Sequence, residues 1–309
     1  MKPLKILPTD LQLTQWGLDR LARQDWDGLL AMIAAYPPET AYKALRLLGD
    51  AAPMETDIGG LLRLGTTPAL TLAGALLHCR AVRIRGLDQA ENVTEDQWEF
   101  YIPTLHHAQE RLMEATERDP LSGLAAAWRA TTFVDSSEED KDSAEIALRA
   151  ARNVPVSGLL ALLGGRSRKW GGSHEEMWRV AHEYARSDTP GSLSLIAKAH
   201  YEELLWLELF EEDPALSATA GSYFKDPAVL AELSEASSQV LATRDHDDPR
   251  NVLLADNWFA YVFYTAGQSR KGRQHLQAIG GNFDRSVWLV EDPETIYNLA
   301  RLKAWLLPA

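Results

Sequence analysis

Cysteine is almost absent from this sequence, which contains one, Cys79, among 309 residues. A single cysteine excludes an internal disulfide and any zinc or iron–sulfur site built from several cysteines. Because Cys79 lies among Leu76, Leu77 and Val82, we expect it to be a buried structural thiol.

Long apolar runs are also missing. No window approaches the roughly 18 uninterrupted apolar residues of a transmembrane helix. The N-terminal stretch Met1–Pro8 has two lysines but lacks the apolar run of a signal peptide. We therefore expect a cytoplasmic protein that has no membrane partner.

Basic residues are in the minority: 31 Lys and Arg stand against 44 Asp and Glu, a net charge of −13 at pH 7. The phosphates of a nucleic acid would be repelled by this charge. We expect no nucleic-acid partner, and a basic protein or peptide is electrostatically easier to bind than an acidic one.

The helix-forming residues Leu and Ala heavily outnumber the β-branched Val and Ile, which predicts an all-α fold with more than half of the residues helical. Helix starts are marked where an Asp or Thr N-cap precedes a proline at the first helical position. The dipeptides of this kind are Asp119-Pro120, Asp213-Pro214, Asp226-Pro227, Asp248-Pro249, Asp292-Pro293, Thr67-Pro68 and Thr189-Pro190.

Apolar periodicity completes the helix prediction. Predicted helices cover residues 10–23, 26–35, 39–48, 68–85 and 94–118, and Pro103 either kinks or divides the last of these. The segment 193–210 is apolar on most faces, so we expect a central helix there. The acidic run 136–142 is the predicted seam between an N-terminal part, 1–135, and a second part, 136–309, although one continuous domain is also compatible.

Near the C-terminus the spacing is that of a degenerate tetratricopeptide-like helix hairpin. Small residues that let two helices approach alternate there with large ones that fill the space between them, at Ala260, Phe263, Gly267, Gly272 and Leu276. We expect an irregular array of helix pairs, an α-solenoid with a concave face.

The sharpest local pattern is the loop 166–172 and the helix start that follows it. Ser173 and Glu176 have the spacing of a capping box. Gly171 and Gly172 allow positive φ angles, and Trp170 is expected to be largely buried and to hold the loop in place.

This loop is also the candidate ligand site. Its three cations, together with exposed amides at a helix N-terminus, would suit a phosphate or carboxylate, whereas solvated cations on a structural loop explain the same residues. The candidate residues are Arg166, Arg168, Lys169, Trp170, Gly171, Gly172, Ser173 and His174, with His200 from a later helix. A hydrogen-bonded core histidine is the commoner reading of His200.

Patterns for catalysis or metal binding are not present. His174-Glu-Glu-Met-Trp178 is not HExxH, and Asp245–Asp248 lacks the glycine and the glutamate of a calcium loop. Neither GxSxG nor a phosphate-binding glycine loop occurs. We therefore expect no catalytic residue, no metal and no other cofactor.

One family resemblance rests on Lys169–Met177, on the helices that flank it, and on the Phe-Ala-Tyr and glycine pattern of 257–281. These segments resemble an uncharacterised bacterial family of helical-repeat proteins, a domain of unknown function. The resemblance extends over roughly the C-terminal two thirds of the chain. It implies a bacterial protein with paired helices and implies no activity.

Two functional hypotheses follow. The first is a non-catalytic helical-repeat protein that binds a peptide or protein in a groove between helix pairs. The second is a small-ligand protein or enzyme that uses the loop 166–174 with His200. Among the tryptophans, Trp206 and Trp258 are expected in the core. Trp26, Trp98 and Trp288 adjoin charged residues and are candidate partner anchors, although core burial is the commoner outcome for most of them.

Overall fold

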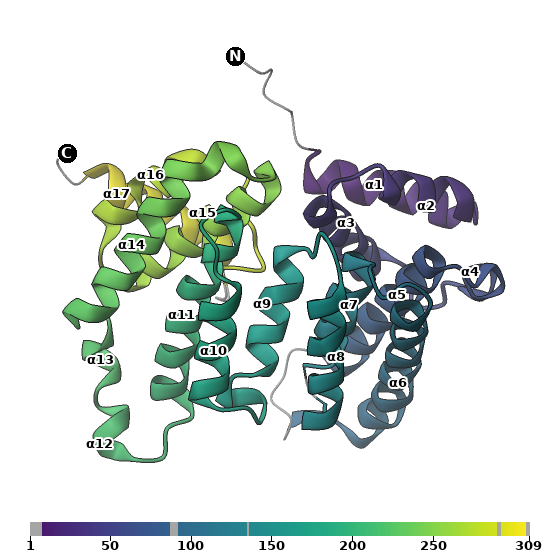
Figure 1. The fold of residues 1–309 in the computed structure, drawn as a ribbon, viewed down its shortest axis with the longest axis horizontal. Coiled ribbons are helices and arrows are strands. Elements are labelled where there is room, and N and C mark those ends of the chain that lie inside the picture. Colours follow the sequence, from purple (N-terminus) through teal and green to yellow (C-terminus); the bar gives the residue numbers. More distant parts are fainter. Residues whose placement is uncertain (1–7, 87–91, 135, 289–291, 307–309) are drawn as a thin grey trace. The chain divides into compact units, whose positions relative to one another are not determined.

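The computed structural model describes residues 8–86, 92–134, 136–288 and 292–306 (Figure 1). Helices make up 77% of it, and the described residues form no β-strand. The prediction of an all-α fold is confirmed. In the part of the chain that the structure describes, no helix combines the length and the apolar composition needed to cross a bilayer.

The chain divides into two compact units, Met1–Leu162 and Leu163–Ala309. The division falls within helix α9 (Val156–Gly165), later than the expected seam at the acidic run. The other helices of unit 1 are α1 (Asp10–Ala22), α2 (Trp26–Ala34), α3 (Pro38–Ala51), α4 (Gly59–Leu64), α5 (Thr67–Arg85), α6 (Glu95–Arg118), α7 (Gly123–Thr132) and α8 (Glu138–Ala150).

Helix α5 is the centre of unit 1, where it packs against α3, α4, α6 and α7. Its glycine and alanines permit this crowding: a methyl group on Gly74 would lie 2.5 Å from the Leu112 side chain of α6. Cys79 is fully buried in this helix, as predicted. Helix α6 runs through Pro103 as one helix.

Unit 2 carries the candidate site. Its elements are the short 3₁₀ helices η2 (Arg168–Trp170), η3 (Pro190–Leu193) and η4 (Arg244–His246), and the α-helices α10 (His174–Tyr184), α11 (Ser194–Leu209), α12 (Pro214–Ser217), α13 (Ala220–Tyr223), α14 (Pro227–Thr243), α15 (Pro249–Thr265), α16 (Ser269–Ile279) and α17 (Pro293–Leu306).

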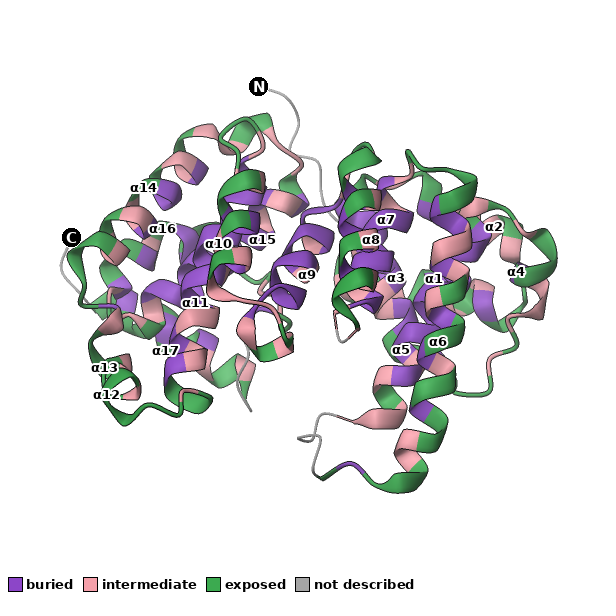
Figure 2. Ribbon diagram, turned by 60° about the horizontal axis from the view of Figure 1, so that its bottom comes forward, coloured by how far each residue is buried: buried purple, intermediate pink, exposed green. Residues whose placement is uncertain are grey.

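Helix α15 is the centre of unit 2 and packs against α11, α14, α16 and α17. It forms a hairpin with α16 through a turn in which Gly267 has φ +69°, and Gly272 of α16 lies against Phe263. In each unit the buried residues lie on the inward faces of the helices (Figure 2). The expectation of a central helix at 193–210 holds only in part, because the end of α11 is exposed at Leu209 and Phe210.

Most of the expected helix starts are present. The carboxylates of Asp213, Asp226 and Asp248 accept hydrogen bonds from amides two residues later, at the starts of α12, α14 and α15. The start expected at Asp119-Pro120 is wrong: Asp119 ends α6, and α7 begins only after the N-cap Ser122. The intervening Pro120 and Leu121 form a turn that is closed by a hydrogen bond from the Ser122 amide to the Asp119 carbonyl. The Leu121 carbonyl also accepts from the amide of Arg152.

Candidate functional site

The loop before α10 is built as a tight turn. Ser173 caps α10, because its hydroxyl accepts from the Glu176 amide at 3.1 Å. Gly171 has φ +85°. A methyl group on Gly172 would lie 2.2 Å from the carbonyl oxygen of Arg166, so only glycine lets the backbone approach so closely. The expected positive φ is present at Gly171 but not at Gly172, which is needed for the close approach of the backbone instead, and the expected serine cap is present.

The cations of the loop are engaged by carboxylates and aromatic rings. Arg166 is only 2% exposed, and its guanidinium lies 3.7 Å from the Glu176 carboxylate. The expectation that these cations are solvated is therefore wrong for Arg166. The Glu176 carboxylate lies toward this arginine, so only the serine half of the expected capping box is formed.

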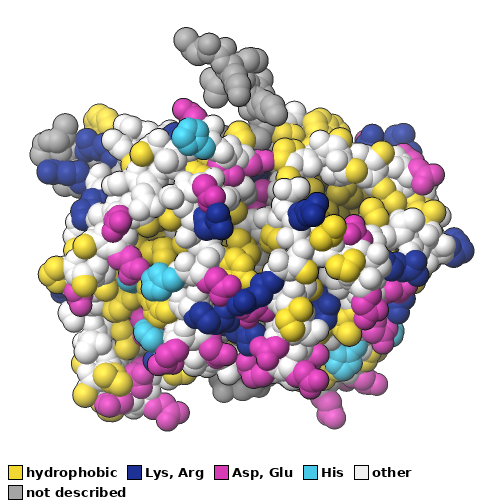
Figure 3. Space-filling model, in the orientation of Figure 1, with side chains coloured by type: hydrophobic (Ala, Val, Ile, Leu, Met, Phe, Trp, Pro, Cys, Tyr) yellow, Lys and Arg dark blue, Asp and Glu magenta, His cyan; other side chains and the backbone are white. Residues whose placement is uncertain are grey.

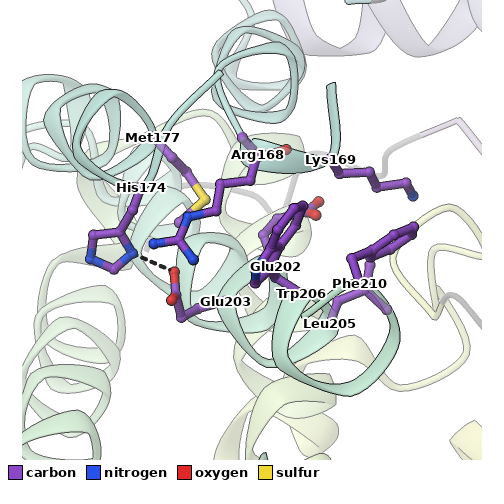
Figure 4. Close-up of a pocket in the computed structure, with 10 residues that line it drawn as sticks. Arg168, Lys169, His174, Met177, Glu202, Glu203, Leu205, Trp206 and Phe210 are labelled. Atoms are coloured by element: carbon purple, nitrogen blue, oxygen red, sulfur yellow. Dashed lines mark hydrogen bonds and ion pairs between the residues drawn. The ribbon is translucent and has the colours of Figure 1, made fainter. Parts of the chain in front are cut away.

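A small pocket lies between the loop and α11 (Figure 4). Arg168 lies over the Trp206 ring at 5.6 Å, and Lys169 points toward Phe210 at 6.0 Å from its ring. The Arg168 guanidinium also lies 4.0 Å from Glu211. The free volume is about 10 Å³, which is about the room that one water molecule needs. A phosphorylated metabolite would have to displace these contacts.

One aromatic prediction in this region needs correction. Trp206, expected in the core, is only partly buried, and its indole N–H donates to Glu211 at the rim of the pocket. Trp170 is of intermediate burial, with the Lys169 ammonium 5.5 Å from its ring. Trp258 is 4% exposed, as predicted for a core residue.

His174 and His200 both lie against the Trp178 ring, but they have different hydrogen-bond partners. The His174 ring bonds to Glu203 at 2.7 Å and lines the pocket of Figure 4. His200 is 2% exposed, with its Nε2 at 3.1 Å from Glu232 and its Nδ1 at 2.8 Å from the Tyr223 hydroxyl. It is a hydrogen-bonded core histidine, and it does not line the pocket.

Glu232 of α14 is shared by two histidines, since His182 of α10 bonds to its other oxygen at 2.9 Å. A neutral imidazole donates from one nitrogen and accepts at the other. Donation from His200 to Glu232 therefore leaves its second nitrogen to accept from Tyr223. On the unit 2 part of Figure 3, histidine side chains lie near acidic and hydrophobic ones.

These contacts predict an acid-sensitive element. The hydrogen bond from His200, opposed by partial burial and aided by the bond from His182, lowers the pKa of Glu232 to about 2 from 4.5. A lowered folded-state pKa adds stability above pH 4.5 that is lost as the pH falls toward 2. We expect the free energy of unfolding of Glu232→Gln to fall less than that of wild type between pH 4.5 and about pH 2. Urea unfolding at a series of pH values in this range measures the difference.

The control is Glu235→Gln, an exposed carboxylate on the same helix. It should leave the pH profile of unfolding as in wild type. If the free energy of unfolding of Glu232→Gln changes with pH in the same way as that of wild type, the histidine contacts do not stabilise the charged carboxylate.

A second polar network, which the sequence analysis missed, joins α14, α15 and α16. His275 bonds to Asp256 through Nδ1 at 2.7 Å and to the Ser237 hydroxyl through Nε2 at 2.7 Å. The order of these groups is that of a hydrolytic triad. However, His275 is 0% and Ser237 5% exposed, and the imidazole stacks on Phe259 at 5.3 Å. A substrate cannot reach this serine, so the network is structural.

The larger opening of unit 2 is a groove between α16 and α17 with a volume of about 830 Å³. Leu302 and Trp305 form its apolar part and are 51% and 78% exposed. Arg273 and Arg301 line the same groove. Arg273 also donates to the carbonyl oxygen of Ala304, which joins the two helices.

A signal for this groove exists in the sequence of α17. Tyr297, Ala300 and Ala304 form the buried face, and the remaining apolar residues have helical spacing of their own. The second stripe consists of Leu299, Leu302 and Leu306, with Trp305 beside it, and all four are exposed. Helix α17 therefore has one apolar face that is buried and a second that is exposed.

Among the described residues no group of three or more His, Cys, Asp and Glu is placed to hold a metal ion. In the acidic stretch 245–248, Asp247 accepts from the Gly191 amide at 2.8 Å and from the Asn251 side chain at 2.9 Å. Asp248 caps α15, as expected. These carboxylates are used for structure.

Comparisons of the chain with protein-family models, curated proteins and solved structures found no match. The resemblance of Lys169–Met177 and its surroundings to a bacterial helical-repeat family therefore stays a prediction.

Proposed function

We propose that this chain is a non-catalytic protein-interaction module, which binds a segment of a partner protein in the groove between α16 and α17. The observation that supports it is the exposure of Trp305 and Leu302 in a groove between two arginines. Tryptophan and arginine are the side chains that most often dominate the energy of protein interfaces.

The apolar residues provide the driving force. Complete burial of an exposed leucine contributes about 1.5–3 kcal/mol, and because Leu302 is 51% exposed, covering it would contribute about half of that. Arg301 is held near the groove by its own helix, since its guanidinium lies 5.6 Å from the Tyr297 ring. A partner that covers the groove would therefore meet a cation of restricted position, which lowers the entropy cost of binding it.

The local charge identifies the class of partner. None of the described residues that line the groove is acidic, and Arg273 and Arg301 are among them. The net charge of −13 favours a basic partner at long range. Charges beyond roughly 10 Å are largely screened at physiological salt. The residues that line the groove therefore determine which charge the bound segment carries. The proposed partner segment is apolar and acidic.

The test is a display selection of random peptides on wild type and on Leu302→Glu, which places a carboxylate in the groove. We expect groove-dependent peptides that combine large apolar residues with Asp or Glu and that lose binding to Leu302→Glu. Leu11→Glu, a change at a 67% exposed leucine of α1, is the matched control and should bind as wild type does. Peptides that bind all three proteins equally would contradict the proposal.

A further inference from the structure

Unit 2 has a second exposed apolar surface, at the end of α11 and the start of α12. Leu209 is 67%, Phe210 42% and Leu216 50% exposed. Exposed apolar residues are ordinary when they are scattered, but a contiguous group is typical of an interaction site. We call the segment 208–216 the acidic corner.

The acidic corner has the charge opposite to that of the groove. It contains Glu208, Glu211, Glu212 and Asp213 and no basic residue. Glu211 faces inward, where it accepts from Trp206, whereas the side chains of Glu208 and Glu212 are exposed. The corner thus presents leucines and a phenylalanine beside carboxylates.

We infer that the groove of one copy of this chain binds the acidic corner of a second copy, head to tail. The inference rests on the proposed function and names its partner. The groove places exposed apolar side chains next to two arginines and no carboxylate. The corner places them next to four acidic residues, which outnumber the two neighbouring cations, Arg168 near Glu211 and Lys169 near Phe210. Complementary charges of this kind select the partner and set the register of contact.

The contact has to form between copies. The corner and the groove lie at opposite ends of unit 2, with α12 at the bottom and α17 at the top of Figure 1, so a chain cannot fill its own groove with its own corner. A two-fold pairing of two grooves would bring Arg273 and Arg301 of one copy toward the same residues of the other. Repulsion between like charges disfavours that arrangement.

A head-to-tail contact has a consequence that a two-fold dimer lacks. Each pair of copies keeps one open groove and one open corner, so further copies can add unless the assembly closes into a ring. We expect wild type to form species larger than a dimer as its concentration rises.

The experiment is sedimentation velocity of the full chain over a concentration series. Leu302→Glu disables the groove, and the double change Leu209→Lys with Leu216→Lys disables the corner. Each variant alone should lose the association that wild type shows. An equal mixture of the two should form a one-to-one dimer and nothing larger, because only one intact corner and one intact groove can meet.

Leu11→Glu is the control and should associate as wild type does, and helical circular dichroism should show that every variant is folded. A wild type that stays monomeric over the whole series would overturn the inference, as would a mixture that gives no dimer. If peptides still select the groove in that case, the proposed function stands with a different partner. If neither the peptides nor the second copy bind, both proposals fail.

Discussion

Replacing Asp256 with alanine is expected to lower the free energy of unfolding of unit 2 by about 3–5 kcal/mol. Asp256 is 2% exposed, and its carboxylate accepts from His275 at 2.7 Å and from Arg244 at 2.9 and 2.7 Å. The change leaves an imidazole and a guanidinium without their shared acceptor. Breaking a buried pair on one side is costly because the remaining group keeps its desolvation penalty.

The value should lie toward the lower end of this range. The Arg244 side chain is 32% exposed, so part of its charge can be hydrated after the carboxylate is removed. His275 is 0% exposed and has no such route. The imidazole is the group whose loss of a partner dominates the cost.

Urea unfolding followed by circular dichroism measures this effect, with Asp245→Ala as the matched control. Asp245 is an exposed carboxylate of the short helix η4, and its removal should change stability by no more than about 0.5 kcal/mol. Equal midpoints for the two variants would show that the network of α14, α15 and α16 contributes no stability.

Truncation of Trp288 to alanine is the second large effect, with an expected loss of about 3–5 kcal/mol. Trp288 is 0% exposed, and its indole N–H donates to the Asn257 side chain at 3.1 Å. Its ring lies 5.2 Å from Tyr261 of α15 and 5.2 Å from Tyr297 of α17. Truncation of this side chain removes its packing against α15 and α17 and leaves the side-chain oxygen of Asn257 with one hydrogen bond fewer.

Because Tyr297 belongs to the buried face of α17, the same change should loosen the helix that forms the groove. Trp305→Ala is the control in a thermal melt: this tryptophan is 78% exposed, and its removal should leave stability within about 0.5 kcal/mol of wild type. A melting temperature for Trp288→Ala that matches the control would mean that α17 is not held by this ring.

The local structure of this chain could be predicted from its sequence to a large extent. An Asp before a proline starts α12, α14 and α15, because the carboxylate satisfies a free amide and the proline has no amide proton to lose. The same reasoning fails at Asp119-Pro120, where the chain makes a turn over residues 119–122 and a long-range bond from the Arg152 amide to the Leu121 carbonyl holds that turn. An N-cap residue before a proline makes a helix start favourable, but contacts with a distant segment can stabilise another conformation there.

Burial was predicted less well for the large polar and aromatic residues. Trp288 adjoins charged residues in sequence and was therefore a candidate partner anchor, yet it is fully buried. Arg166 was expected in solvent and is buried against Glu176. In both cases the neighbours that determine burial come from other elements of the fold, and local composition does not report them.

The sequence by itself determined the helical class, most helix ends and the glycine-dependent turn before α10. These features depend on backbone propensity, capping and periodicity within a few residues. Only the tertiary structure decided that Ser237, Asp256 and His275 meet, that the pocket of the loop is nearly filled, and that the arginines of α16 and α17 flank one groove. Such contacts join residues far apart in the chain, and their distances follow from how the helices pack, which no local pattern encodes.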